Sequence, residues 1–201
     1  MTKWFSVLFS GAATLALAAC GASSNPTGLP EGAFWEAIAP LCGNGYLGDM
    51  TTTYSADRDW KNSRLILHFE SCTRDGVVIN FNITDDRTRT WTLTHTNGGT
   101  IQYRIDRSEG SGPGISAYGG LSTQGPDSLV QVFPIDEASK AKFAELGIIG
   151  SLSNVWTLAL NSEAETLSYH VQRASSERGM IFDLSEAVRV ETPDGWQPAF
   201  D

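Results

Sequence analysis

The residues most able to do chemistry in this sequence are His95 and the neighbouring carboxylates of Asp85 and Asp86. His95 shares one face of a predicted strand with Trp91, so its ring can point inward. A histidine beside a carboxylate can act as a general base in hydrolysis. The other interpretation is structural, because aspartates in turns bind their own backbone and a histidine at a strand end can be buried and satisfied. These three residues are therefore only weak catalytic candidates.

Other catalytic signatures are missing from the sequence. His68 and His170 fall on the polar side of their strands, away from His95, so the histidines predict no zinc site. Gly-x-Ser-x-Gly, Ser-x-x-Lys, His-Glu-x-x-His and phosphate-loop motifs do not occur. We therefore predict no metal and no cofactor, and the sequence leans away from an enzyme.

The elements that would position these residues are strands. Residues 64–107 indicate two consecutive β-hairpins, with period-two apolar spacing and turns containing Asp-Gly and Asn-Gly. Further strands are predicted at 49–54, 129–133, 155–160, 166–171 and 180–184. Residues 110–127, rich in glycine, are interpreted as a surface loop or lid in which Tyr118 either gates a pocket or simply anchors the loop.

Two short helices complete the prediction. Pro30 can start an N-terminal helix that carries Phe34 and Ile38 and plugs one end of the sheet. Asp136 can cap a second helix, near 136–147, that stops at Gly147. We expect a mainly β domain over 31–201: an antiparallel meander that forms a barrel or a strongly curved sheet.

Alternation places the apolar residues of these strands on a common face. The opposite face, which includes Asn80 and Asn82, is expected to be solvated. If the apolar face encloses a cavity, five residues are the candidate ligand-binding lining: Trp91, His95, Tyr103, Trp156 and Tyr169.

The N-terminus has the pattern of a signal peptide. Lys3 precedes a short apolar stretch, and small residues end it at Ala19. Leu17-Ala18-Ala19-Cys20 resembles the bacterial lipoprotein signal, which implies cleavage after residue 19 and lipid attachment at Cys20, with palmitate among the acyl chains. Residues 20–30 would form a flexible tether. Gly21 after the cysteine implies that the protein is located at the outer membrane and faces the periplasm. The other interpretation is an ordinary secretory cleavage, in which Cys20 has no role.

Composition and charge limit the classes of molecule that the protein can bind. The 201-residue chain has a net charge of −9, which becomes −10 once residues 1–19, with their single charge at Lys3, are removed. An acidic body argues against nucleic acid, which requires a basic footprint. If Cys20 is lipidated, Cys42 and Cys72 are an even pair in an oxidising compartment and can form a disulfide, although two reduced cysteines remain the alternative.

Several short blocks resemble a family of small exported bacterial proteins, known only as secreted or hypothetical. The blocks are Leu41-Cys42-Gly43, Ser71-Cys72, Asp85-Asp-Arg-Thr-Arg-Thr-Trp91 and Tyr118-Gly-Gly120. The resemblance implies an envelope or secreted setting and a Cys42–Cys72 pair, without a substrate. The meander is also similar to lipocalin-type barrels, a likeness of fold that does not determine function.

The sequence thus favours a lipid-anchored envelope protein with a binding or structural role, holding a small apolar ligand inside a barrel. One alternative is a periplasmic hydrolase that uses His95 with Asp85 or Asp86. Another is an inhibitor or assembly factor that binds a protein through exposed Trp60, Trp196 and Phe200.

Overall fold

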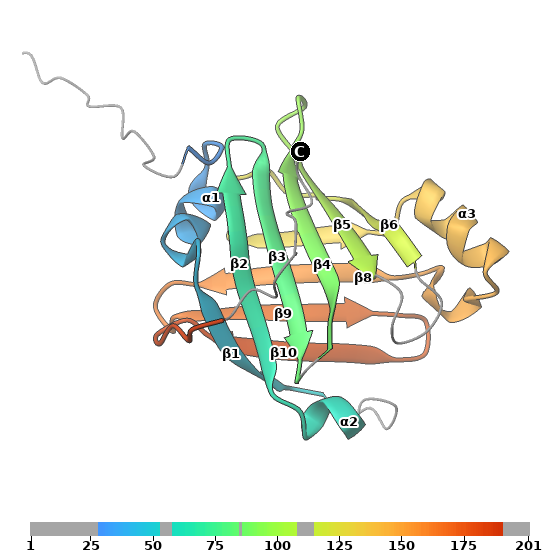
Figure 1. Ribbon diagram of the computed structural model, residues 1–201. Coiled ribbons are helices and arrows are strands. Elements are labelled where there is room, and N and C mark those ends of the chain that lie inside the picture. Colours follow the sequence, from blue (N-terminus) through green and yellow to red (C-terminus); the bar gives the residue numbers. More distant parts are fainter. Residues whose placement is uncertain (1–27, 53–57, 85, 108–114, 191–201) are drawn as a thin grey trace, which may run out of the picture.

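The computed structural model describes residues 28–52, 58–84, 86–107 and 115–190. The predicted signal peptide, most of the predicted tether with Cys20, and Asp85, Trp196 and Phe200 lie outside the described residues. Ten strands form one antiparallel sheet in the order β6-β5-β4-β3-β2-β1-β10-β9-β8-β7. The sheet curls into a nearly closed barrel, with β2–β5 crossing in front of β8–β10 (Figure 1). The predicted fold class is therefore confirmed.

The strands alternate with short turns along most of the chain. Their bounds are β1 Gly45–Met50, β2 Leu65–Thr73, β3 Gly76–Ile83, β4 Asp86–His95, β5 Ile101–Arg107, β6 Ile115–Leu121, β7 Val130–Pro134, β8 Val155–Asn161, β9 Thr166–Gln172 and β10 Glu177–Asp183. The helical segments are α1 Ala33–Ile38, η1 Ala39–Leu41, α2 Arg58–Lys61, α3 Glu137–Glu145 and η3 Ile149–Ser151.

The inward face of the sheet is the predicted apolar face. Its aliphatic and aromatic side chains in β2–β5 and β8–β10 are almost entirely buried, from Leu67 and Phe69 to Phe182. The outward face differs from the prediction at Asn80 and Asn82, which are buried rather than solvated. Asn80 is held by a hydrogen bond that it donates to Glu70 and one that it accepts from Thr90. Periodicity assigns a side chain to one face of the sheet, but it does not show which other groups cover that face.

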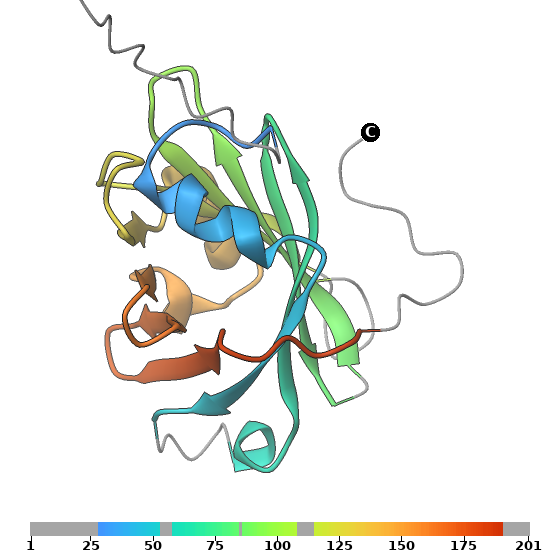
Figure 2. The same cartoon turned by 90° about the vertical axis from the view of Figure 1, so that its left-hand side faces the viewer.

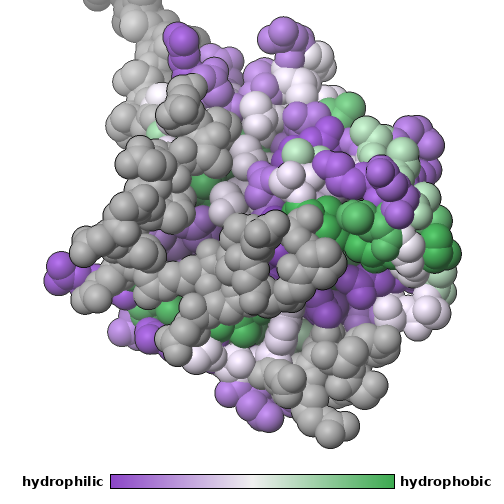
Figure 3. Space-filling view, turned by 45° about the vertical axis from the view of Figure 1, so that its right-hand side comes forward, coloured by the Kyte–Doolittle hydropathy of each residue, from purple (hydrophilic) through white to green (hydrophobic). Residues whose placement is uncertain are grey.

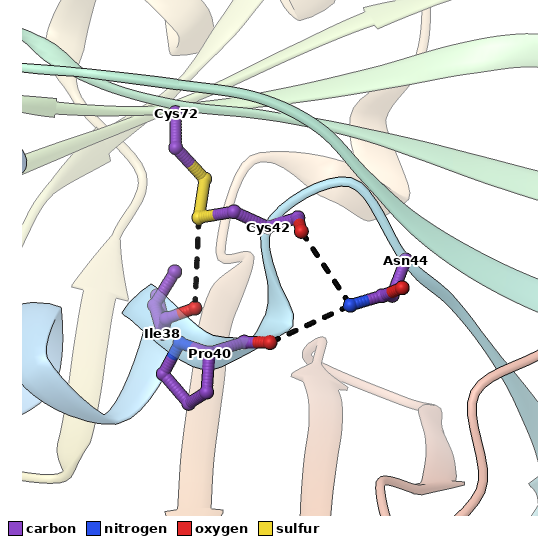
Figure 4. Close-up of a disulfide and its surroundings, with 5 residues drawn as sticks. All are labelled: Ile38, Pro40, Cys42, Asn44 and Cys72. Carbon is purple, nitrogen blue, oxygen red and sulfur yellow. Dashed lines mark hydrogen bonds between the residues drawn. A yellow bond between two sulfur atoms is a disulfide. The ribbon is translucent and has the colours of Figure 1, made fainter. Parts of the chain in front are cut away.

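Helix α1 closes one end of the barrel. Phe34, Trp35 and Ile38 are fully buried, and α1 lies across the opening between the two groups of strands (Figure 2). The Cys42–Cys72 disulfide joins the end of this helical segment to β2, as predicted, with 6.0 Å between the Cα atoms. Beside it, Cys42 Sγ lies 3.7 Å from the Ile38 carbonyl oxygen (Figure 4). An oxidised sulfur has no proton to donate, so this is a packing contact.

Helix α3 begins at Asp136, as predicted. The Asp136 carboxylate accepts a hydrogen bond from the Ser139 amide at 2.8 Å and pairs with Arg104 at 2.6 Å. Burial opposes ionisation of Asp136, but the hydrogen bonds from Ser139 and the contact with Arg104 outweigh it and lower the pKa of the carboxyl. The helix is followed by Gly147, whose φ of 69° suits a residue without a side chain.

The barrel is closed where the first and last strands of the order, β6 and β7, meet. The Thr123 amide donates to the Val132 carbonyl at 2.9 Å, and the Asp136 amide donates to the Gly119 carbonyl at 3.0 Å. The Gln124 side chain accepts a hydrogen bond from the Val132 amide at 2.8 Å. Backbone and side-chain bonds therefore cover two strand edges that would otherwise be available for pairing with another chain.

The prediction of a loop over residues 110–127 is wrong for its central part. Ile115–Leu121 is strand β6, which pairs with β5. The first strand is also displaced, from the predicted 49–54 to Gly45–Met50. Exposed apolar side chains include Leu146 and Ile149, which follow α3 in the sequence. Figure 3 shows one face of the molecule, on which hydrophobic residues gather in a patch among hydrophilic ones.

Candidate ligand-binding site

Four arginines stand at inward-facing positions where strands end at one side of the barrel. Arg89 of β4 pairs with Arg107 of β5. Arg178 of β10 pairs with Val171 of β9, and Arg173 lies two residues after Val171. Each arginine occupies the next inward position beyond an apolar residue of its strand, because alternate residues share a face. We call these four residues the arginine collar.

The collar surrounds a pocket of about 450 Å³ that reaches into the barrel. The aromatic rings in the wall include those of Trp60, Trp91, Tyr118, Trp156 and Tyr169. The volume lies in the range typical of small-molecule sites, roughly 300–1,000 Å³. None of the described residues that line the pocket is a carboxylate. The lining therefore combines an aromatic body with a cationic rim.

Trp60 lies between two members of the collar. The Arg178 Cζ is 4.1 Å and the Arg89 Cζ is 5.1 Å from the Trp60 ring centroid, both within the range of cation–π attraction. Trp60 is half-buried there, so it does not provide the exposed surface that a protein-binding role would use.

The collar also acts on Tyr118, which packs against Phe143 and Trp156 with ring centroids 5.1 and 6.1 Å away. Burial raises the pKa of the Tyr118 phenol, and the positive charges of all four collar arginines offset part of that rise. Each guanidinium is therefore close enough to influence one hydroxyl group inside the pocket. Burial also raises the pKa of Tyr169, so both phenols are neutral at physiological pH.

Two residues of the lining each carry a buried polar atom without a hydrogen-bond partner among the described residues that the site can use: Asn154, which is only 3% exposed, through its Oδ1, and Arg173 through its Nε. Leaving a buried polar group unpaired costs about 1–3 kcal/mol, so such groups are usually explained by water, an ion or a ligand. Both atoms are available to a molecule in the pocket.

Of the five predicted lining residues, the structure places Trp91, Trp156 and Tyr169 in the wall of the pocket. Tyr103 is fully buried behind it, with its ring centroid 6.0 Å from those of Trp91 and Trp156. His95 lies elsewhere, at the last position of β4, beside the turn that leads to β5.

The same geometry separates the residues of the hydrolase hypothesis. Asp86 is the first residue of β4 and His95 is the last. Nine steps of about 3.3 Å place their Cα atoms roughly 30 Å apart, far beyond hydrogen-bond reach or a bridge through one water. His95 and Asp86 therefore do not form a catalytic pair, and this part of the hypothesis is wrong.

The collar was missed by sequence reasoning although its signal is present. The predicted inward face stopped at the last apolar residue of each strand, whereas the same parity continues to Arg89, Arg107, Arg173 and Arg178. One arginine at a strand end suggests an exposed rim. Four at the same inward parity, on strands that meet in one sheet, indicate a charged ring.

Comparisons with protein-family models, curated proteins and solved structures gave no match. The resemblance to exported bacterial proteins therefore stays a prediction. Within the described ranges, no group of three or more histidine, cysteine or acidic residues is arranged to hold a metal ion. No helix of the described part is long and apolar enough to cross a membrane.

Proposed function

We propose that this protein is a binding protein whose barrel holds a small amphipathic anion. The observation that carries the proposal is the convergence of four inward-facing arginines on an aromatic pocket of about 450 Å³. The apolar part of the ligand would lie against the rings deep in the pocket, and its anionic group would lie at the arginine collar. This proposal adds an anionic group to the apolar ligand that the sequence predicts.

Arg173 is a member of the collar that is suited to contact the anion. Its Nε has no hydrogen-bond partner among the described residues. A guanidinium presents a planar fork that matches carboxylate, sulfonate or phosphate oxygens. Because the pocket is partly enclosed, charge attraction there is stronger than in open water. The remaining three arginines add positive potential at the same place.

Two dyes test this function. 1-Anilinonaphthalene-8-sulfonate (ANS) carries a sulfonate on an aromatic body, and N-phenyl-1-naphthylamine is the matched neutral compound. We expect ANS to bind more tightly than the neutral dye and Arg173→Gln to weaken ANS binding by roughly 10- to 100-fold, the loss of a charged hydrogen bond worth about 1.5–3 kcal/mol. Affinity for the neutral dye should change little. Fluorescence titration of the folded protein measures both constants.

The control is Arg74→Gln, which removes a cation that is 88% exposed in the turn between β2 and β3. It should leave both affinities unchanged. Equal affinity for the two dyes, or equal loss of ANS binding in both arginine variants, would show that the pocket does not select an anion.

We further propose that the protein is tethered by lipid at Cys20 in the bacterial envelope, at the outer membrane and facing the periplasm. The Cys42–Cys72 disulfide supports an oxidising setting, and the lipoprotein-like residues before Cys20 support the anchor. Cys20→Ser is expected to abolish incorporation of labelled palmitate and to move the protein from the membrane fraction to the soluble periplasmic fraction. Persistent labelling of the variant would contradict the proposal.

A further inference from the structure

Strand β6 breaks the alternation of a regular strand next to the pocket. Ile115 and Tyr118 both line the pocket, although they are three residues apart. In a regular strand, residues separated by an odd number point to opposite faces. One additional residue must therefore be accommodated between them.

That residue is accommodated in a β-bulge that contains Ala117. On the partner strand, Ile105 pairs with Tyr118 and Arg107 pairs with Ile115, so a step of two residues in β5 faces a step of three in β6. Ala117 has a φ of 52°, which is uncommon for a residue with a side chain. Its amide donates to the Asp106 carboxylate at 2.7 Å. Bulges of this kind redirect side chains and occur next to functional sites.

We propose that Tyr118 is an anion-contacting residue of the pocket and that the Ala117 bulge is the device that turns its hydroxyl toward the arginine collar. This inference rests on the proposed function and adds a specific contact to it. Without the bulge, Tyr118 would point outward, and the pocket would lose both its ring and its hydroxyl. Strain held at one residue thus positions another residue for binding.

The chemistry of the hydroxyl fits this role. Because burial keeps the phenol of Tyr118 protonated, with its pKa raised, its O–H can donate a hydrogen bond to an anion. A donor of this kind adds direction to the charge attraction of the collar, since guanidiniums attract any anion but a single O–H selects a position. Tyr118 would therefore contribute to affinity for an anionic ligand and not to affinity for a neutral one.

The first test is Tyr118→Phe, which keeps the ring and removes the hydroxyl. We expect affinity for ANS to fall roughly 10-fold, as for one lost hydrogen bond to a charged group, while affinity for N-phenyl-1-naphthylamine stays the same. Tyr46→Phe is the matched control, because Tyr46 is a buried tyrosine on β1 and is not among the residues lining this pocket. A purely structural role for Tyr118 would change both dye affinities together.

The second test acts on the bulge. Ala117→Gly, which accepts a positive φ, should keep wild-type affinities for both dyes. Ala117→Val disfavours the same backbone conformation without shortening the chain and should weaken ANS binding. Near-ultraviolet circular dichroism checks the fold of each variant.

The two proposals fail in different ways. If wild-type protein prefers ANS and Arg173→Gln removes that preference, but Tyr118→Phe binds ANS like the wild type, the inference about Tyr118 is overturned and the proposed function stands. If the wild type does not prefer ANS over the neutral dye, the proposed function itself is overturned. If Ala117→Val binds both dyes like the wild type, the bulge is not the positioning device.

Discussion

Removal of the Cys42–Cys72 disulfide is expected to lower the free energy of unfolding by roughly 3–4 kcal/mol. The two cysteines are 30 residues apart in sequence, and cutting the bond releases this long loop in the unfolded state. For a domain of this size each kcal/mol corresponds to about 2–4 °C in Tm, so the melting temperature should fall by roughly 6–16 °C. Thermal unfolding of Cys42→Ser/Cys72→Ser protein measures the loss.

The disulfide has a local consequence as well, because it fastens the segment that closes one end of the barrel. Reducing agent should lower the Tm of the wild type toward that of the double variant and should leave the double variant unchanged. A double variant that melts within about 1 °C of the wild type would mean that packing of Phe34, Trp35 and Ile38 alone holds this end. The arginine collar includes none of these residues, so dye binding at low temperature should persist.

Much of this barrel could be predicted because its strands obey simple periodicity. Residues 64–107 alternate regularly, and the structure has β2, β3, β4 and β5 there, joined by turns such as the one that ends at Gly76. The same rule explains the failure at β6. A bulge at Ala117 breaks the alternation, and Gly119 and Gly120 have no side chain that could show a face. Pattern reasoning therefore took a strand for a loop.

The candidate site could be predicted in part, and the missing part has a physical cause. Aromatic residues on the inward face can be found because burial favours them, and Trp91, Trp156 and Tyr169 do line the pocket. The arginines are on the same face but have the polarity of a solvent-exposed surface. Only the register, which brings four strand ends together around one pocket, distinguishes a collar from scattered surface charges. Sequence spacing within one strand does not contain that register.

Gly120→Ala is expected to disrupt the junction at which β6 and β7 close the barrel. A Cβ atom at residue 120 would lie 1.9 Å from the Pro134 carbonyl oxygen. Because that oxygen belongs to the backbone of β7, the clash cannot be relieved by rotating a side chain, and the two strands must move apart. Crowding of this kind typically costs about 1–3 kcal/mol, and we expect the upper end.

The matched control is Gly125→Ala, in the loop that joins the same two strands, where an added Cβ would have no heavy atom within 4 Å. Thermal unfolding should therefore separate the two variants clearly. Hydrogen exchange gives the local readout: the amides of Thr123 and Asp136, which bond across the junction, should exchange faster in Gly120→Ala. Because Tyr118 is two residues from Gly120, the same variant should also weaken ANS binding. Equal stability and equal exchange in both variants would show that the barrel stays closed without this close approach.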